Sequence, residues 1–136
     1  MNLRRRRVEP VVERRPLRPS PQSSLTLAGL PVPPAMNGIA FGNEGLASRV
    51  KRYRSWQSAA SWQVRLQEPR RVRGRVAVSI TVEETARNDL ESLVKAGIDL
   101  LCDLNLIDGD HRDGIREVHL RRDAARGMRI EVSPVG

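Results

Sequence analysis

Hydrophobic residues recur with two different periods along the chain, and these periods predict its elements. From residue 46 to about residue 67 apolar side chains recur every three to four positions, which predicts a helix. Between residues 73 and 82 apolar and polar side chains alternate, as in a strand with one buried face. The helical spacing returns from residue 88 or 89 to about residue 104. The central part of the chain is therefore predicted to run helix, strand, helix.

Shorter apolar runs complete the order of elements. Residues 25–27 are a predicted short strand that leads into a stiff, proline-rich loop over residues 29–37. Residues 115–121 and 128–132 are two further predicted strands, joined by a turn. The order β, α, β, α, β, β predicts a small α/β (α+β) domain, with a mixed sheet of about four strands and two main helices.

The first residues differ in composition from the rest of the chain. Residues 1–23 hold seven arginines against two glutamates, a net charge of +5, together with four prolines. Such a segment buries too little apolar surface to offset the entropy lost on ordering. We therefore predict a disordered basic tail over residues 1–23 and a single domain over residues 24–136. The tail could attract phosphates or have no role, and the sequence leaves both open.

The charge of the whole chain favours a polyanionic partner. The formal net charge is +8, and nearly all of the basic residues are arginine. This balance is typical of proteins that bind nucleic acid. No apolar run approaches the length of about eighteen residues that spans a membrane, and the single cysteine, Cys102, cannot form an internal disulfide. We expect a cytoplasmic protein with no membrane partner.

Acidic residues gather around the second predicted helix. Glu91, Lys95 and Asp99 recur every four residues, and an ordinary solvent-exposed charge ladder explains these three on their own. Asp89 stands at the helix entrance, where a carboxylate can cap the helix or bind a cation. Asp110 follows the helix in an Asp-Gly-Asp loop, which is also a common turn signal. Carboxylates that converge can hold Mg²⁺ and leave positions for water and phosphate.

These acidic residues carry a resemblance to a known family. The string Asp-Leu-Glu-x-Leu-x-Lys at residues 89–95, with the acidic loop at residues 108–110, resembles the core motif of the RusA family of Holliday junction resolvases. The strand at residues 25–27 that leads into Pro33-Pro34-x-x-Asn37 and a basic helix is similar to the N-terminal part of that family. The resemblance covers roughly residues 25–132.

The resemblance implies a homodimer that cuts four-way DNA junctions in recombination and repair by paired symmetric hydrolysis. It implies one or two Mg²⁺ ions per subunit, with Mn²⁺ as a substitute. Asp89, Glu91 and Asp110 would be the metal-binding catalytic carboxylates, and Lys95 would be the catalytic lysine that stabilises charge on the phosphate. Branched DNA and a second copy of the chain would then be the partners, with no small-molecule substrate.

Basic groups outside the acidic motif are the expected contacts to DNA phosphates. Any one of them is more often a generic surface charge, and only the groups together favour binding. The basic candidates are Arg87, Lys51, Arg52, Arg54, Arg70, Arg71 and Arg73, and the neutral side chain of Asn37 is a further candidate contact.

Three positions depart from the family pattern and keep other functions open. Glu91 stands in place of an aspartate, Ser92 in place of an asparagine, and Gly109 in place of the first member of an Asp-Asp pair. One alternative is a non-catalytic DNA-binding protein in which the acidic site is degenerate. Another is a metal-dependent nuclease that prefers flaps or forks, because metal ligands report the chemistry and not the shape of the substrate.

Overall fold

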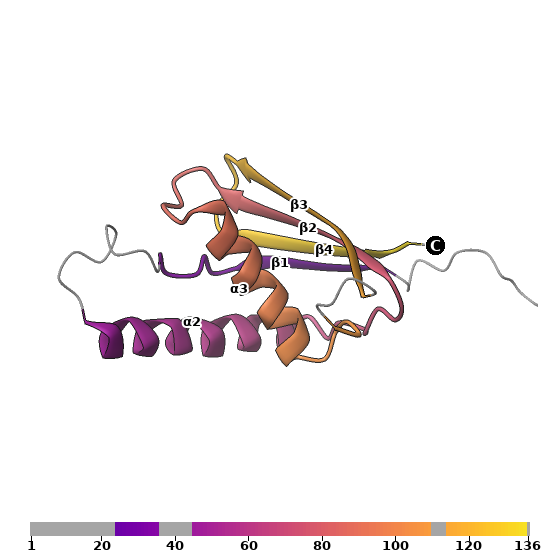
Figure 1. Ribbon diagram of the computed structural model, residues 1–136, viewed down its shortest axis with the longest axis horizontal. Coiled ribbons are helices and arrows are strands. Elements are labelled where there is room, and N and C mark those ends of the chain that lie inside the picture. Colours follow the sequence, from indigo (N-terminus) through magenta and orange to yellow (C-terminus); the bar gives the residue numbers. More distant parts are fainter. Residues whose placement is uncertain (1–23, 36–44, 110–113, 136) are drawn as a thin grey trace, which may run out of the picture.

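The computed structural model of the 136-residue chain describes residues 24–35, 45–109 and 114–135. The elements within these ranges confirm the predicted order and the small α+β domain (Figure 1). The predicted tail at residues 1–23 lies outside the described residues, as do Asn37 and Asp110. The elements are β1 (Leu25–Leu30), α2 (Leu46–Leu66), β2 (Val76–Glu83), α3 (Leu90–Asp103), β3 (Ile115–Asp123) and β4 (Met128–Pro134).

The described strands form one mixed sheet in the order β1-β4-β2-β3. β4 pairs antiparallel with both β1 and β2, whereas β2 and β3 are parallel. Parallel neighbours need a connection that returns to the starting end of the sheet, and α3 lies within that connection. The two ends of α3 are therefore near opposite ends of β2, which governs where the candidate site residues lie.

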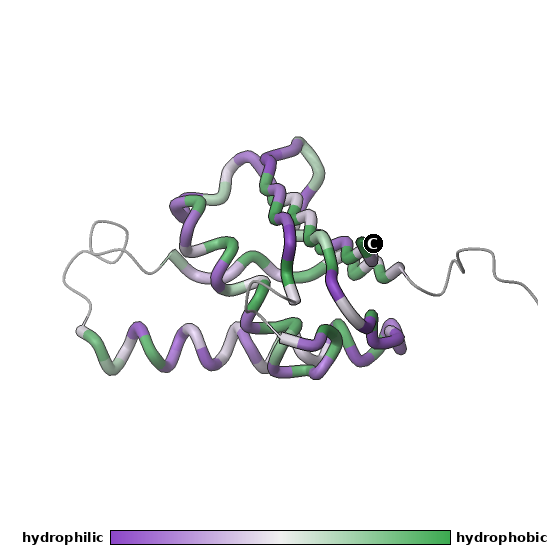
Figure 2. Tube along the Cα trace, turned by 45° about the vertical axis from the view of Figure 1, so that its right-hand side comes forward, coloured by the Kyte–Doolittle hydropathy of each residue, from purple (hydrophilic) through white to green (hydrophobic). Residues whose placement is uncertain are grey.

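One face of the sheet forms the core with both helices. Val78 and Ile80 of β2 and Ile130 of β4 are fully buried on this face. Gly97 of α3 lies so close that a Cβ there would meet the Ile80 side chain at 2.8 Å. Figure 1 shows α2 and α3 on the same side of the sheet, and Figure 2 shows hydrophobic positions alternating with hydrophilic ones along the strands. The apolar residues of the alternating pattern in β2 thus face the core, as the sequence predicted.

The helix α2 contributes to the core mainly through its second half. Its buried side chains are Trp56, Ala60 and Val64, while Leu46 in the first turn is 68% exposed. Tyr53 is partly buried and packs against the same core. None of the described helices combines the length and the apolar character needed to cross a membrane.

Gly127, in the turn between β3 and β4, lies close to the end of β1, and a substitution there can measure how close this contact is. Its φ of +80° is unfavourable for any other residue, and a Cβ there would lie 2.8 Å from the Leu30 carbonyl oxygen. Gly74 has the same φ, but open space around it. Gly74→Ala should lower the free energy of unfolding by about 1–2 kcal/mol through backbone strain alone.

Gly127→Ala should lower the free energy of unfolding further than Gly74→Ala does, because the clash with the Leu30 carbonyl adds to the same backbone strain. Urea denaturation of the two variants beside the unmodified protein measures the difference. Equal losses would show that the contact between β1 and the turn is looser than the structure has it.

Candidate functional site

The turn between β2 and α3 is held from two sides. The Arg122 guanidinium of β3 donates to the Ala86 carbonyl at 2.8 Å and to the Asn88 carbonyl at 2.9 Å. The side-chain Nδ2 of the buried Asn88 donates to the Pro33 carbonyl at 2.9 Å. These bonds fix the backbone immediately before Asp89, so the entrance of α3 is a preorganised position.

The proline-rich loop after β1 faces the turn between β2 and α3 across a cleft. Trp56 of α2 donates from its indole Nε1 to the Pro31 carbonyl at 2.8 Å, which ties this loop to the helix. Between the loop, α2 and the turn lies a cleft of about 370 Å³. It is lined by Val32, Pro33, Ala35, Arg52, Ala86, Arg87 and Asn88.

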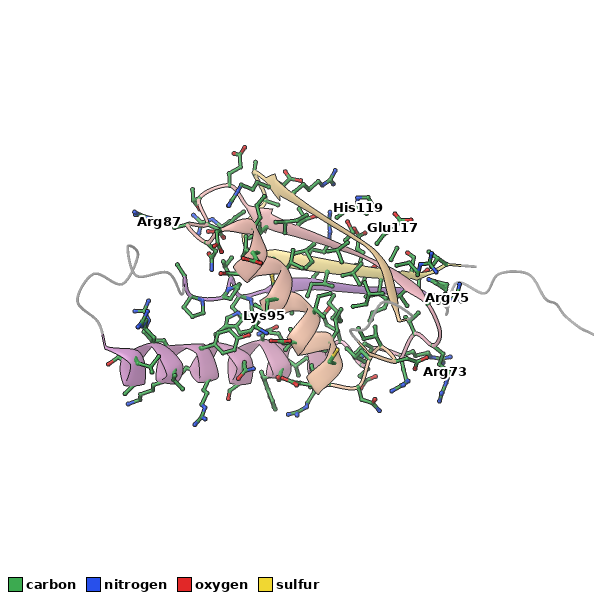
Figure 3. The ribbon with its side chains drawn as sticks, in the orientation of Figure 1. Arg73, Arg75, Arg87, Lys95, Glu117 and His119 are labelled. Carbon is green, nitrogen blue, oxygen red and sulfur yellow. The ribbon has the colours of Figure 1, made fainter. Side chains whose placement is uncertain are left out.

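Two of the arginines predicted to bind DNA meet in this cleft. Arg52 comes from α2 and Arg87 from the turn, next to Asn88 and Asp89. Figure 3 shows Arg87 near the N-terminal end of α3. A cleft with two guanidinium groups suits an anionic ligand such as a phosphate, because each group offers paired N–H donors.

Asp89 caps α3, which is one of the two roles the sequence left open. Its Oδ1 accepts from the Ser92 backbone amide at 3.0 Å, and its own φ and ψ are extended. Hydrogen bonds from the Ser92 hydroxyl and amide lower the pKa of Asp89, so the carboxylate is charged at neutral pH. Glu91 lies in the first turn and is exposed. A cap uses one carboxylate oxygen and leaves the other able to bind a cation.

Lys95 pairs with Asp99, one of the two i,i+4 pairs that the spacing of Glu91, Lys95 and Asp99 indicated. Its Nζ lies 3.5 Å from the Asp99 carboxylate, and its side chain is 76% exposed. Burial, followed by the negative charges of Asp99 and Asp103, raises the pKa of Tyr53 on α2. These carboxylates of α3 are thus close to α2. The Lys95–Asp99 pair is explained without any substrate.

The acidic loop after α3 is anchored far from Asp89. Asp108 Oδ2 accepts from the Gly74 amide at 2.7 Å, and Oδ1 pairs with Arg71. Both partners lie just before β2, whereas Asp89 follows β2, so the length of α3 separates the two acids. Fourteen residues of α-helix span about 20 Å.

The third carboxylate of the expected metal site, Asp110, lies outside the described residues, so the structure describes only Asp89 and Glu91 of that set. Asp108, two residues before Asp110, accepts from the Gly74 amide and does not lie beside Asp89. Within residues 24–35, 45–109 and 114–135, no group of three or more His, Cys, Asp or Glu side chains could hold a metal ion. The expected three-carboxylate site therefore stays a prediction.

The remaining predicted phosphate contacts fall into different places. Arg71 bonds Asp108 and Asn105, so it holds the loop after α3 in position. Arg70 and Arg73 are exposed near the same loop, and Figure 3 shows Arg73 at the opposite end of the sheet from Arg87. Lys51 and Arg54 line surface depressions on α2, outside the cleft that contains Arg52.

Sequence reasoning did not single out Arg122, which holds the turn before Asp89. In the sequence it is one of several arginines near the predicted strand at residues 115–121, and nothing distinguishes it from a solvated surface charge. Only the parallel pairing of β3 with β2 brings Arg122 beside Val82 and within reach of the turn.

No known protein-family model matches the chain, and no curated protein matches it either. The case for a function therefore rests on the residues and on the geometry described above.

Arg122→Met should destabilise the protein by loosening the turn before Asp89. It removes two hydrogen bonds from a charged donor and leaves the Ala86 and Asn88 carbonyls without that partner. We expect the free energy of unfolding to fall by about 1–2 kcal/mol, measured by urea denaturation. Arg121→Met is the matched control, because neighbouring side chains of a strand point to opposite faces. Equal effects of the two substitutions would contradict the role assigned to Arg122.

Asp108 should make stability depend on pH. The Gly74 amide, followed by Arg71, lowers the pKa of its carboxyl group. A lowered folded pKa stabilises the protein fully above the unfolded aspartate value of about 3.9. That contribution is lost as the pH falls through the lowered folded value.

The unmodified protein should therefore be more stable than Asp108→Asn at neutral pH. The difference should shrink as the pH falls below the unfolded aspartate pKa of about 3.9. Thermal unfolding of both proteins over a series of pH values measures it. A difference that does not change with pH would show that folding does not lower the pKa of Asp108.

Proposed function

We propose that this protein is a Mg²⁺-dependent, structure-selective endodeoxyribonuclease that resolves four-way DNA junctions by paired cuts, as its resemblance to the RusA family implies. The observation that supports this most is at the entrance of α3. There Asp89 and Glu91 stand next to a cleft that Arg52 and Arg87 line from two different elements. Carboxylates can hold the metal for phosphodiester hydrolysis, and guanidinium groups can hold the phosphate.

Two protein carboxylates are enough to bind one Mg²⁺ ion. Mg²⁺ keeps several waters and is commonly bound by one or two carboxylates together with phosphate oxygens of the substrate. The lowered pKa of Asp89 keeps that ligand charged, and Glu91 is exposed beside it. Bound Mg²⁺ would supply an activated water for attack on phosphorus. Arg52 and Arg87 would hold the phosphate, and Lys95 would offset charge on it.

The resemblance also makes Asp110 a metal ligand and the protein a homodimer. Asp110 lies outside the described residues, and we propose that it completes the ligand set at the α3 entrance of its own subunit or of the partner in a dimer. Two-fold symmetry also matches the substrate, because a four-way junction presents two equivalent strands to a C₂ dimer. We place the protein in the cytoplasm, in DNA recombination and repair.

One specific observation favours a second candidate, a DNA-binding protein without catalytic activity. Asp89 caps its helix and Lys95 pairs with Asp99, so both have structural partners that need no metal. In that case junction binding would weaken with salt but would not depend on Mg²⁺ beyond screening.

Cleavage of DNA substrates separates the candidates. We expect paired symmetric nicks in a fixed four-way junction with Mg²⁺, and none in matched duplex or in EDTA. Asp89→Asn should reduce cleavage roughly a hundredfold or more, since it removes a charged metal ligand. Asparagine still caps a helix, so the fold should survive. Glu117→Gln, on the exposed edge strand β3, removes a carboxylate elsewhere and serves as the control.

Junction binding without any cut in Mg²⁺ or Mn²⁺ would overturn the nuclease and establish the binding protein. Faster cleavage of flaps or forks would keep the chemistry and change the substrate. Mixing Asp89→Asn subunits with Asp110→Asn subunits then tests the dimer, because a shared site leaves one complete set of ligands in the mixed dimer. Recovery of cleavage supports a site made by two subunits, and no recovery contradicts it.

A further inference from the structure

The two tryptophans of α2 have opposite environments. Trp56 is 6% exposed and bonded to the loop after β1, whereas Trp62 is 60% exposed. Six residues along a helix turn the side chain by about 240°, so Trp62 points away from the core that Trp56 joins. Trp62 is not among the hydrophobic side chains that form the described core or pack against it. An indole there has neither a packing role nor a part in the cleft beside Asp89.

Trp62 lies in a shallow surface depression of about 470 Å³. The depression is lined by Arg54, Gln57, Ser58, Ser61, Trp62, Arg65 and Asp103. A second depression of about 320 Å³ continues toward the start of the helix and shares Arg54 and Ser58 with the first. It is lined by Ala47, Val50, Lys51, Arg54, Ser55 and Ser58. We call the continuous surface from Ala47 to Arg65 the α2 track.

The charge of the α2 track is positive. α2 holds five basic residues and no acidic residue between Leu46 and Leu66. Lys51, Arg54 and Arg65 line the track, and Asp103 of α3 contributes one negative charge at its edge. Three serine hydroxyl groups lie between these charges. The ring of Trp62 is thus surrounded by groups that bind phosphates and hydroxyls, and not by an apolar rim.

We propose that the α2 track binds single-stranded DNA, with an unpaired base stacked on Trp62 and the neighbouring phosphates on Lys51, Arg54 and Arg65. Exposed aromatic rings in a basic groove bind single strands because every unpaired base offers a π-face. Duplex DNA does not offer this face, because its bases are stacked on one another. The inference rests on the nucleic-acid part of the proposed function and adds a second surface, separate from the cleft beside Asp89.

A binding assay in EDTA tests the proposal without any cleavage. Full-length protein is titrated into a fluorescently labelled short oligothymidylate, and the affinity is read from the anisotropy. Trp62→Leu should weaken binding by roughly five- to a hundredfold, because it keeps an apolar side chain but removes the stacking surface. Trp62→Phe should retain most of the affinity.

Two controls separate stacking from charge and from general apolar contact. An abasic oligonucleotide of the same length carries the same phosphates without bases, so it should bind the unmodified protein and Trp62→Leu equally. Leu66→Ala removes another exposed apolar side chain, 59% exposed and one helical turn from Trp62, and should leave the affinity for oligothymidylate unchanged.

Equal affinity of Trp62→Leu and the unmodified protein for oligothymidylate would overturn the proposal, as would equal binding of abasic DNA and oligothymidylate by the unmodified protein. A third outcome also counts against it. If Trp62→Leu and Leu66→Ala both shift the protein alone to a lower mass in sedimentation, a protein surface covers the track instead. Because the assay contains no Mg²⁺, failure of the nuclease proposal leaves these results intact.

Discussion

The parallel pairing of β2 with β3 is the constraint on which the rest of the structure depends. Two parallel neighbours need a crossover, and α3 lies in it against the apolar face of the sheet. The helix therefore starts where β2 ends and finishes near the start of β3. Asp89 and Asp108 therefore lie in the connections at opposite ends of α3, a helix of fourteen residues that spans about 20 Å.

The same pairing decides what the arginines do. Arg122 on β3 reaches the turn before Asp89, and Arg71 before β2 reaches Asp108, so each holds one of the two connections that flank α3. Their guanidinium groups bind the protein's own carbonyl and carboxylate oxygens. Arg52 and Arg87 line the cleft at the start of α3. The arginines of the chain thus include some that hold the fold and two that line the cleft where we propose that a phosphate binds.

The helix α2 separates the two surfaces that we propose for DNA. One side carries Trp56, which bonds the loop that forms a wall of the cleft, and the other carries Trp62. Helical geometry alone puts Arg52 toward the cleft and Lys51 and Arg54 on the outer track. A branched DNA molecule offers a strand to be cut, and it offers unpaired bases where pairs open at the branch or where a single strand leaves it. Two surfaces on one rigid helix could hold these parts at a fixed separation.

The sequence by itself determined the order of the elements, the bounds of α2 to within a residue or two, and the position of Asp89 at the entrance of α3. It could do so because hydrophobic period and capping are local properties of the chain. Only the tertiary structure decided that Asp89 and Asp108 lie apart, and that Arg71 and Arg122 bond the protein itself. These outcomes depend on which strands pair and on which helix face packs, and such long-range contacts leave no local pattern in the sequence.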